Sequence, residues 1–379
     1  MTQTRIYLDY AATAPLLPEA LAAMMPLLAG APQNASSLHF EGRRARAVLD
    51  EARERIAACL GAKRREIVFC ASGSEADTLA IFGTARLRPG RHIVSCAVEH
   101  HAVLRALESL ESAGYDVTLL PVDRAGVVDP QRFESALRPE TALASVMYAN
   151  NEIGSIEPIA ELAAIAHRRG VPFHSDAVQA PGWLPIDVDA LPVDLMSLSA
   201  HKFGGPAGVG VLYVRDGSAI APIVYGGGQE AGRRAGTEHL AGVMGAAVAL
   251  ELAEARRTQN GPRVATMRDR LEQHLLATIA RSRVNGAGAV RLPNLTNLAF
   301  SGVTAEAMAV RLDLEGIAIS PGAACTSGVA EPSHVVAALG DGDAREAVRF
   351  SLGPTTTSDE IERTLQIVPA AVAELRRGE

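Results

Sequence analysis

Lys202 carries an amine able to form a covalent bond, and it stands directly after an apolar run of the sequence. The run, residues 193–198, predicts a buried strand, and an unpaired ammonium buried at its end would cost several kcal/mol or lose its proton. Ser199 and His201 lie beside the lysine and could donate hydrogen bonds to a phosphate. A lone lysine at a strand end is more often a surface residue, so its neighbours decide the interpretation.

Two further predicted strands end in residues of matching chemistry. Gly73 and Ser74 open a helix after the strand at 66–70, where free amides suit a phosphate, although a plain helix cap explains the same residues. Asp176 follows the strand at 171–175, where an apolar setting requires a cationic or donor partner unless the residue is another cap. Phosphate donors, an aspartate and a lysine are together what pyridoxal phosphate requires, because the lysine links to its aldehyde and the aspartate keeps its pyridine nitrogen protonated.

These residues need a sheet to bring them together, and the hydrophobic pattern predicts one. Strand-like runs alternate with helical patterns, which indicates a mainly parallel sheet covered by helices on both faces. Ligands of such sheets bind beyond the carboxyl ends of the strands. The predicted strands are 66–70, 92–95, 117–122, 143–148, 171–175, 195–199 and 210–214.

The chain is long enough for two lobes, since it has 379 residues. A helical pattern at 239–258 is followed by a turn signal at 259–262 and another helical pattern at 264–279. We therefore predict a large α/β domain over residues 15–258. Residues 1–14 and 259–379 would form a smaller α+β domain.

Composition argues against several classes of protein. A formal net charge of −7 disfavours a nucleic-acid binder, and the arginines at 43–46 fit a solvated helix face better. The first seven residues lack the pattern of a secretory signal, and no apolar run is as long as a membrane span. The four cysteines form no Cys-x-x-Cys pair, which predicts free thiols in the cytoplasm and no metal site.

A family resemblance joins these motifs. Asp-Ala-Val-Gln at 176–179, followed by Ser-Ala-His-Lys at 199–202, resembles the pyridoxal phosphate motif of class V aminotransferase-fold enzymes. The segments at 8–13, 99–100, 150–154 and 349–353 narrow the resemblance to cysteine desulfurases. The similarity extends from about residue 6 to about residue 375. It implies the type I fold of pyridoxal phosphate-dependent transferases, with the mainly parallel sheet in the large domain.

The resemblance also implies roles around the cofactor ring. Lys202 would be covalently linked to pyridoxal phosphate, which explains a lysine at the end of a buried strand. Asp176 would pair with the pyridine nitrogen, while Gln179 and Asn151 would contact the ring hydroxyl. His100 would stack on the ring and move a proton during the reaction.

The phosphate site follows from the same resemblance. Gly73, Ser74, Ser199 and His201 would bind the phosphate group. In the family, a threonine of the partner subunit completes this site, and the matching residue here is Thr237. The resemblance therefore implies a homodimer.

Substrate binding and reaction specificity would depend on two further regions. Arg349, with Asn151, would bind the carboxylate of L-cysteine. Residues 319–328 are small and surround Cys325, which could be an ordinary buried thiol. The match of residues 320–327 to the Ser-x-Gly-x-Ala-Cys-Thr-Ser segment of desulfurases of the nitrogen-fixation and iron–sulfur housekeeping type makes Cys325 the nucleophile. The other cysteines would be structural: Cys59, Cys70 and Cys96.

The implied reaction converts L-cysteine to L-alanine and leaves a persulfide on Cys325, for iron–sulfur cluster assembly or for thiolation of tRNA or a cofactor. The acceptor protein stays open between a scaffold, a thiolation enzyme and a dedicated partner. Three other readings also stay open. The protein could be a selenocysteine lyase, another class V pyridoxal phosphate enzyme, or a sulfur-relay adaptor on the same fold without cofactor.

Overall fold

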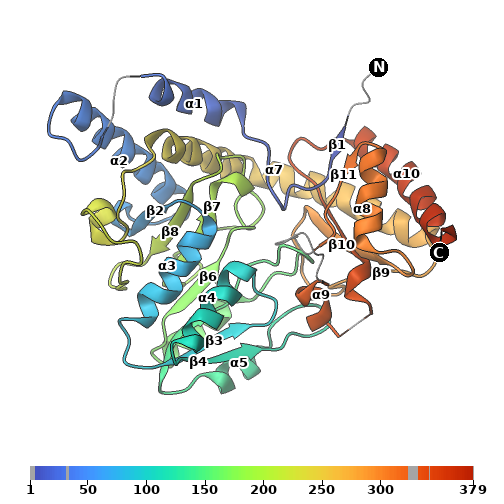
Figure 1. The fold of residues 1–379 in the computed structure, drawn as a ribbon, viewed down its shortest axis with the longest axis horizontal. Helices are drawn as coiled ribbons and strands as arrows, with labels where there is room; N and C mark the ends of the chain where they lie inside the picture. Colours follow the sequence, from blue (N-terminus) through green and yellow to red (C-terminus); the bar gives the residue numbers. More distant parts are fainter. Residues whose placement is uncertain (1–4, 31–33, 323–331, 341, 379) are drawn as a thin grey trace.

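The molecule consists of two sheet-containing parts joined by one long helix (Figure 1). The structure is a computed structural model that describes residues 5–30, 34–322, 332–340 and 342–378. The larger part holds the sheet whose strands end at the candidate cofactor residues named above, and the smaller part holds both ends of the chain.

Within the described residues, the larger part contains a seven-stranded sheet in the order β2-β8-β7-β6-β5-β3-β4. Strand β8 runs antiparallel to both of its neighbours, and every other pair is parallel. The predicted α/β class with a mainly parallel sheet is therefore confirmed. The strands are β2 (Ile67–Cys70), β3 (His92–Cys96), β4 (Asp116–Leu120), β5 (Thr141–Ser145), β6 (Phe173–Asp176), β7 (Leu195–Ser199) and β8 (Gly210–Val214).

Helices cover both faces of this sheet because its strands are apolar on both sides. In β2, Ile67 and Phe69 enter one buried cluster, whereas Val68 and Cys70 enter another on the opposite face. The second cluster is covered by α3 and α4, and the first by α2, α5, α6 and the start of α7. The helices are α1 (Pro18–Leu28), α2 (Phe40–Leu60), α3 (Gly73–Ala85), α4 (His101–Ser112), α5 (Pro130–Ala136) and α6 (Ile159–Arg168), with short 3₁₀ turns η1 (Arg64–Glu66), η2 (Ala200–Lys202) and η3 (Gln229–Gly232).

The smaller part is built around an antiparallel sheet of order β12-β10-β9, counted over the described residues. Strand β1 from the N-terminal segment pairs in parallel with β11, so both ends of the chain meet here (Figure 1). A separate apolar cluster fills the space between this sheet and its helices. The elements are β1 (Ile6–Tyr7), β9 (Ser282–Val284), β10 (Leu295–Phe300), α8 (Ala305–Leu314), β11 (Ile317–Ala318), α9 (His334–Ala338), η4 (Ala344–Glu346), β12 (Ala347–Ser351) and α10 (Ser358–Arg377).

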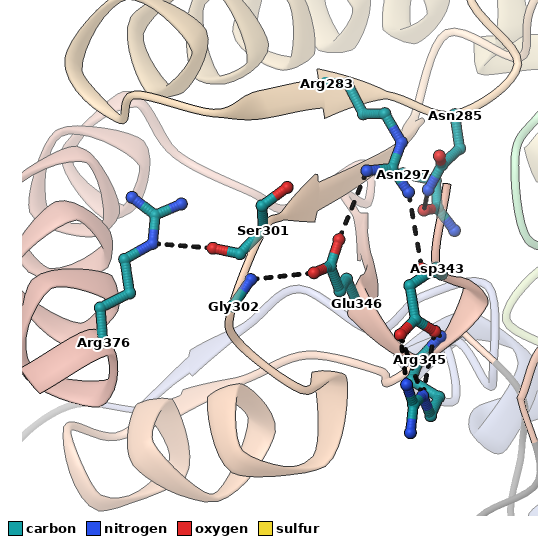
Figure 2. Close-up of polar contacts among 9 residues, drawn as sticks. All are labelled: Arg283, Asn285, Asn297, Ser301, Gly302, Asp343, Arg345, Glu346 and Arg376. Atoms are coloured by element: carbon teal, nitrogen blue, oxygen red, sulfur yellow. Dashed lines mark hydrogen bonds and ion pairs between the residues drawn. The ribbon is translucent and has the colours of Figure 1, made fainter. Parts of the chain in front are cut away.

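Polar side chains fix the turns of the small sheet (Figure 2). Glu346 accepts a hydrogen bond from the Gly302 amide at 2.8 Å and lies 3.4 Å from the Arg283 guanidinium. Asn285 and Asn297 are linked through their side chains at 2.7 Å. Asn297 also donates to the carbonyl of Glu152 at 3.0 Å, which ties the small sheet to the loop after β5.

The turn predicted at 259–262 is wrong, because α7 (Leu240–Thr278) runs through it without interruption. Pro262 removes one backbone hydrogen bond of the helix. Packing on both sides of the proline outweighs that loss: Leu250 lies in the cluster of the large sheet, and Val264 and Leu271 lie in the cluster of the small part. A domain boundary at 258 would therefore fall inside a helix, and the division into residues 15–258 and the remainder stays a prediction.

Over the described part of the chain, none of the helices combines the length and the apolar character needed to cross a bilayer.

Candidate active site

A cavity of about 270 Å³ opens at the carboxyl ends of the parallel strands. Every residue predicted to contact the cofactor lines it, with the exception of Thr237. They arrive from five separate strand ends, which explains why the sheet is needed. The lining residues are Ser72, Gly73, Ser74, Asp77, His100, Met147, Ala149, Asn151, Asp176, Val178, Gln179, Ser199, His201 and Lys202.

One end of the cavity is the N-terminus of α3. Ser72 caps the helix, and its hydroxyl accepts from the Glu75 amide at 3.1 Å. A Cβ on Gly73 would lie only 3.0 Å from Cγ2 of Val178 and 3.1 Å from Cβ of Ser199, so the backbone approaches its neighbours too closely for a larger residue. The helix amides therefore stay accessible for an anionic group.

Lys202 lies in η2 and is partly buried, and its amine has two hydrogen-bond partners. Its Nζ donates to the carbonyl of Ala11 at 2.7 Å and to that of Ala12 at 2.8 Å, both from the N-terminal segment. Burial, followed by the nearby positive charge of Arg349, lowers its pKa to about 8. The amine is thus much closer to its neutral, nucleophilic form than an exposed lysine would be.

Asp176 ends β6 and is 6% exposed. One carboxylate oxygen accepts from the Val178 amide at 2.9 Å. Burial raises the pKa of Asp176 to about 6, against the opposing effects of that hydrogen bond and of Lys202. A buried carboxylate in this state is suited to a cationic partner, such as a protonated ring nitrogen.

Asp77 is a cavity residue that sequence reasoning missed. It is 1% exposed, and its Oδ1 has no hydrogen-bond partner among the described residues. Burial and the charge of Asp176 raise its pKa well above the usual range. Its position four residues after Gly73, on the same face of α3, was the signal that could have found it.

The two histidines of the cavity are neutral. His100 caps α4, and its Nδ1 accepts from the Ala102 amide at 3.1 Å, which leaves the ring proton on Nε2. Burial, with the charge of Lys202, lowers the pKa of His100 to about 4. The same causes lower the pKa of His201 to about 4, and its Nδ1 lies 3.1 Å from the Thr13 hydroxyl.

The predicted amide residues lie on the side of the N-terminal segment. Gln179 donates to the Ala11 carbonyl at 3.0 Å. The neighbouring Asn150 forms the turn, because its side chain accepts from the amides of Glu152 and Ile153 at 2.8 and 3.0 Å. Asn151 is thereby left to line the cavity.

Arg349 reaches this region from β12 in the small part. It is 4% exposed, and it donates to the Asn151 carbonyl at 2.9 Å and to Oδ1 of Asp9 at 2.8 Å. Its Nε has no partner among the described residues. Arg349 does not itself line the cavity, and its partner Asp9 was part of a recognised motif without an assigned role.

The remaining predicted residues are not brought into the cavity. Thr237 is exposed and is not among the residues that line the cavity of its own chain. Cys325 lies outside the described residues. Burial raises the pKa of Cys59 to about 12 and those of Cys70 and Cys96 well above the usual range, so these thiols stay protonated.

Comparison with known proteins agrees with this geometry. The class V aminotransferase model matches residues 6–364. The cysteine desulfurase IscS of Dictyoglomus turgidum is 46% identical over 375 residues, covering 98% of this chain and 95% of that protein. The corresponding protein of Methanosarcina thermophila is 42% identical, with 98% and 93% covered.

Solved structures show the same relationship. A NifS-like protein superposes with a TM-score of 0.92 at 31% identity, covering 98% of this chain and 100% of the other. A structure described as SspA in complex with cysteine superposes with a TM-score of 0.81 at 35% identity, covering 93% and 100%. The chain therefore belongs to the class V aminotransferase family and, within it, to the cysteine desulfurases.

Proposed function

We propose that this protein uses pyridoxal phosphate to convert L-cysteine to L-alanine, and that it passes on the sulfur as a persulfide of Cys325. The observation that carries this proposal is the convergence of Lys202, Asp176, His100 and the α3 N-terminus on one cavity. Each supplies a group that this cofactor needs, and the amine and the carboxylate both have pKa values moved toward neutrality by burial.

The residues present fit the cofactor. The tightly packed Gly73, with Ser74, Ser199 and His201, would hold the phosphate at the α3 N-terminus. Asp176, which has no cationic side chain at hydrogen-bond distance among the residues that the structure describes, would pair with the pyridine nitrogen.

The other contacts complete the ring site. Gln179 and Asn151 would contact the ring hydroxyl, His100 would lie against the ring, and Lys202 would form the covalent link. When bound, pyridoxal phosphate supplies a protonated ring that accepts the electron pair left on the substrate Cα after deprotonation.

The protein's own groups then have separate tasks. Arg349 would hold the substrate carboxylate, since its Nε has no partner within the described ranges of the chain and its other nitrogens are already oriented by Asp9 and Asn151. The Nζ of Lys202, with its pKa lowered to about 8, would take the proton from Cα. His100 would carry a proton on Nε2.

Sulfur transfer is assigned to Cys325 from the sequence. Its thiolate would attack the substrate sulfur, so that a sulfur–sulfur bond forms and the carbon–sulfur bond breaks. The carbon keeps the electron pair, takes a proton and becomes the methyl group of alanine. The persulfide would then pass to an acceptor protein, either an iron–sulfur scaffold or a thiolation enzyme.

We further propose that the enzyme works as a homodimer in the cytoplasm. Thr237 of the partner subunit would complete each phosphate site, which accounts for its exposure and its absence from the lining of its own chain's cavity. The free thiols of Cys59, Cys70 and Cys96 suit a reducing compartment.

The test has two incubations of the holoenzyme with L-cysteine. With dithiothreitol, which reduces the persulfide and releases its outer sulfur as sulfide, we expect equal amounts of alanine and sulfide. Without dithiothreitol, we expect mass spectrometry to find a persulfide on the Cys325 peptide. The Cys325→Ser variant should keep its yellow cofactor and release no sulfide. Undiminished alanine release by that variant would overturn the assignment of Cys325, and faster turnover of L-selenocysteine would favour a selenocysteine lyase.

A further inference from the structure

The segment at residues 226–237, which ends at Thr237, contains unusual backbone geometry. Glu230 and Ala231 are consecutive residues in the left-handed region, with φ of 50° and 56°. Residues with a Cβ rarely adopt this conformation, because Cβ approaches the following carbonyl oxygen. Such strain persists only where surrounding contacts determine it, and it concentrates at functional sites.

The contact that determines it is a buried ion pair with α2. Glu230 is 6% exposed and Arg53 is 8% exposed. The carboxylate accepts from two guanidinium nitrogens of Arg53 at 2.6 and 2.7 Å, and also from the Phe69 amide at 2.9 Å. Arg53 additionally donates to the Ile67 carbonyl at 2.6 Å and lies over the Phe69 ring. The strained residue is therefore fastened to β2, the edge strand of the large sheet.

A second pair ties the same segment to α3. Arg234 donates to both carboxylate oxygens of Glu75, at 2.7 and 3.2 Å, and Glu75 also accepts from the Ala71 amide at 2.7 Å. Glu75 follows Ser74 directly in the first turn of α3. The segment is thus held from two sides, although Thr237 at its end remains exposed and contributes nothing to the cavity of its own chain.

We propose that Glu230 is a positioning residue whose buried pair with Arg53 holds residues 226–237 in the conformation that presents Thr237 to the phosphate site of a second copy of this chain. The inference rests on the proposed role of Thr237. It adds that the cofactor affinity of one subunit depends on Glu230 of the partner subunit. A merely local role would act instead through β2 and α3 on the cavity of the same chain.

Heterodimers separate these two cases. Two differently tagged chains are co-expressed, one of them carrying Lys202→Ala, so that borohydride can fix pyridoxal phosphate on the other chain alone. Glu230→Gln is placed either on the Lys202→Ala chain, to act in trans, or on the chain that keeps Lys202, to act in cis. Mass spectrometry of the Lys202 peptide then gives the cofactor concentration for half loading.

We expect loading to weaken about tenfold when Glu230→Gln acts in trans and to stay unchanged when it acts in cis, since a charge-assisted bidentate pair is lost in the segment that crosses over. Weakening in cis alone, equal weakening in both arrangements, or no weakening would each overturn the proposal. Glu251→Gln is the matched control, because it breaks the pair between Arg55 of the same helix α2 and Glu251 of α7, which lies outside residues 226–237. It should have no effect in either arrangement.

Two further variants keep the test decisive. Arg53→Lys keeps the positive charge but loses the planar guanidinium fork that pairs with Glu230. If chains with Glu230→Gln fail to assemble, Arg53→Lys takes its place, and we expect it to weaken loading in trans in the same way. Thr237→Ala in trans tests the underlying proposal. If it leaves loading unchanged, the proposed role of Thr237 fails; if it weakens loading while Glu230→Gln and Arg53→Lys do not, only the role of Glu230 fails.

Discussion

At the scale of single residues, burial brings the protonation equilibria of the candidate site toward neutral pH. It lowers the pKa of Lys202 to about 8 and raises that of Asp176 to about 6, because both charged forms lose hydration. In the part of the chain that the structure describes, neither group has an oppositely charged side chain at hydrogen-bond distance, and Lys202 donates to two backbone carbonyls instead. A cofactor that forms a covalent link with the Lys202 amine and an ion pair with the Asp176 carboxylate would offset the cost of lost hydration at both groups.

The first prediction concerns the attachment of pyridoxal phosphate to the cofactor-free protein. Only the neutral amine attacks an aldehyde, so the attachment rate should rise about tenfold per pH unit below the pKa and level off above a pH of about 8. Stopped-flow absorbance at excess cofactor measures this, with N-acetyl-lysine amide as the reference for an exposed amine. A rate that keeps rising to the pKa of the reference would contradict the prediction.

The second prediction concerns Arg349. Replacement by lysine removes the planar fork that reaches both the Asn151 carbonyl and Asp9, so the substrate carboxylate would meet a poorly placed charge. We expect Arg349→Lys to raise the KM for L-cysteine by about tenfold or more, with cofactor content unchanged. Initial-rate kinetics provide the measurement. Arg345→Lys, at an exposed pair with Asp343, is the control and should leave KM unaltered.

At the scale of elements, the sequence predicts a strand or helix well when its signal lies in neighbouring residues, and poorly when tertiary packing determines it. Strands β7 and β8 were predicted with the observed bounds because a strand that is buried on both faces is a mostly apolar run of a few residues. The break at residues 259–262 was predicted wrongly because their turn chemistry is local, whereas the packing that continues α7 through them is tertiary.

The same distinction applies to the candidate site. Lys202, Asp176 and His100 carry local motifs and were found from the sequence. Asp9 was not assigned a role, because its contact with Arg349 joins residues 340 positions apart and no local pattern records it.

The third prediction tests the continuity of α7. Gly261 lies inside the helix, and an added Cβ would meet no atom within 4 Å. Gly261→Ala should therefore raise the free energy of unfolding by about 1 kcal/mol, through helix propensity. Thermal unfolding of the cofactor-free protein, followed by circular dichroism, measures it. A marked loss of stability would instead indicate a turn that requires glycine at this position.

At the scale of the whole molecule, the distribution of site residues predicts an assembly. Each chain of 39.7 kDa carries an exposed Thr237 at the end of a firmly held segment and a cavity that lacks it. We therefore expect light scattering to give twice the mass of one chain. Dilution into monomers should release pyridoxal phosphate, measured as loss of visible absorbance. A monomer that retains the cofactor with undiminished affinity would contradict this view.

The single helix α7 contributes to both apolar clusters, and this has a bearing on how the enzyme can move. Because α7 is one continuous helix packed in both apolar clusters, it provides no hinge about which one part of the molecule could rotate relative to the other. Opening and closing during turnover must then come from shorter pieces of chain, and the two lobes should melt as one cooperative block.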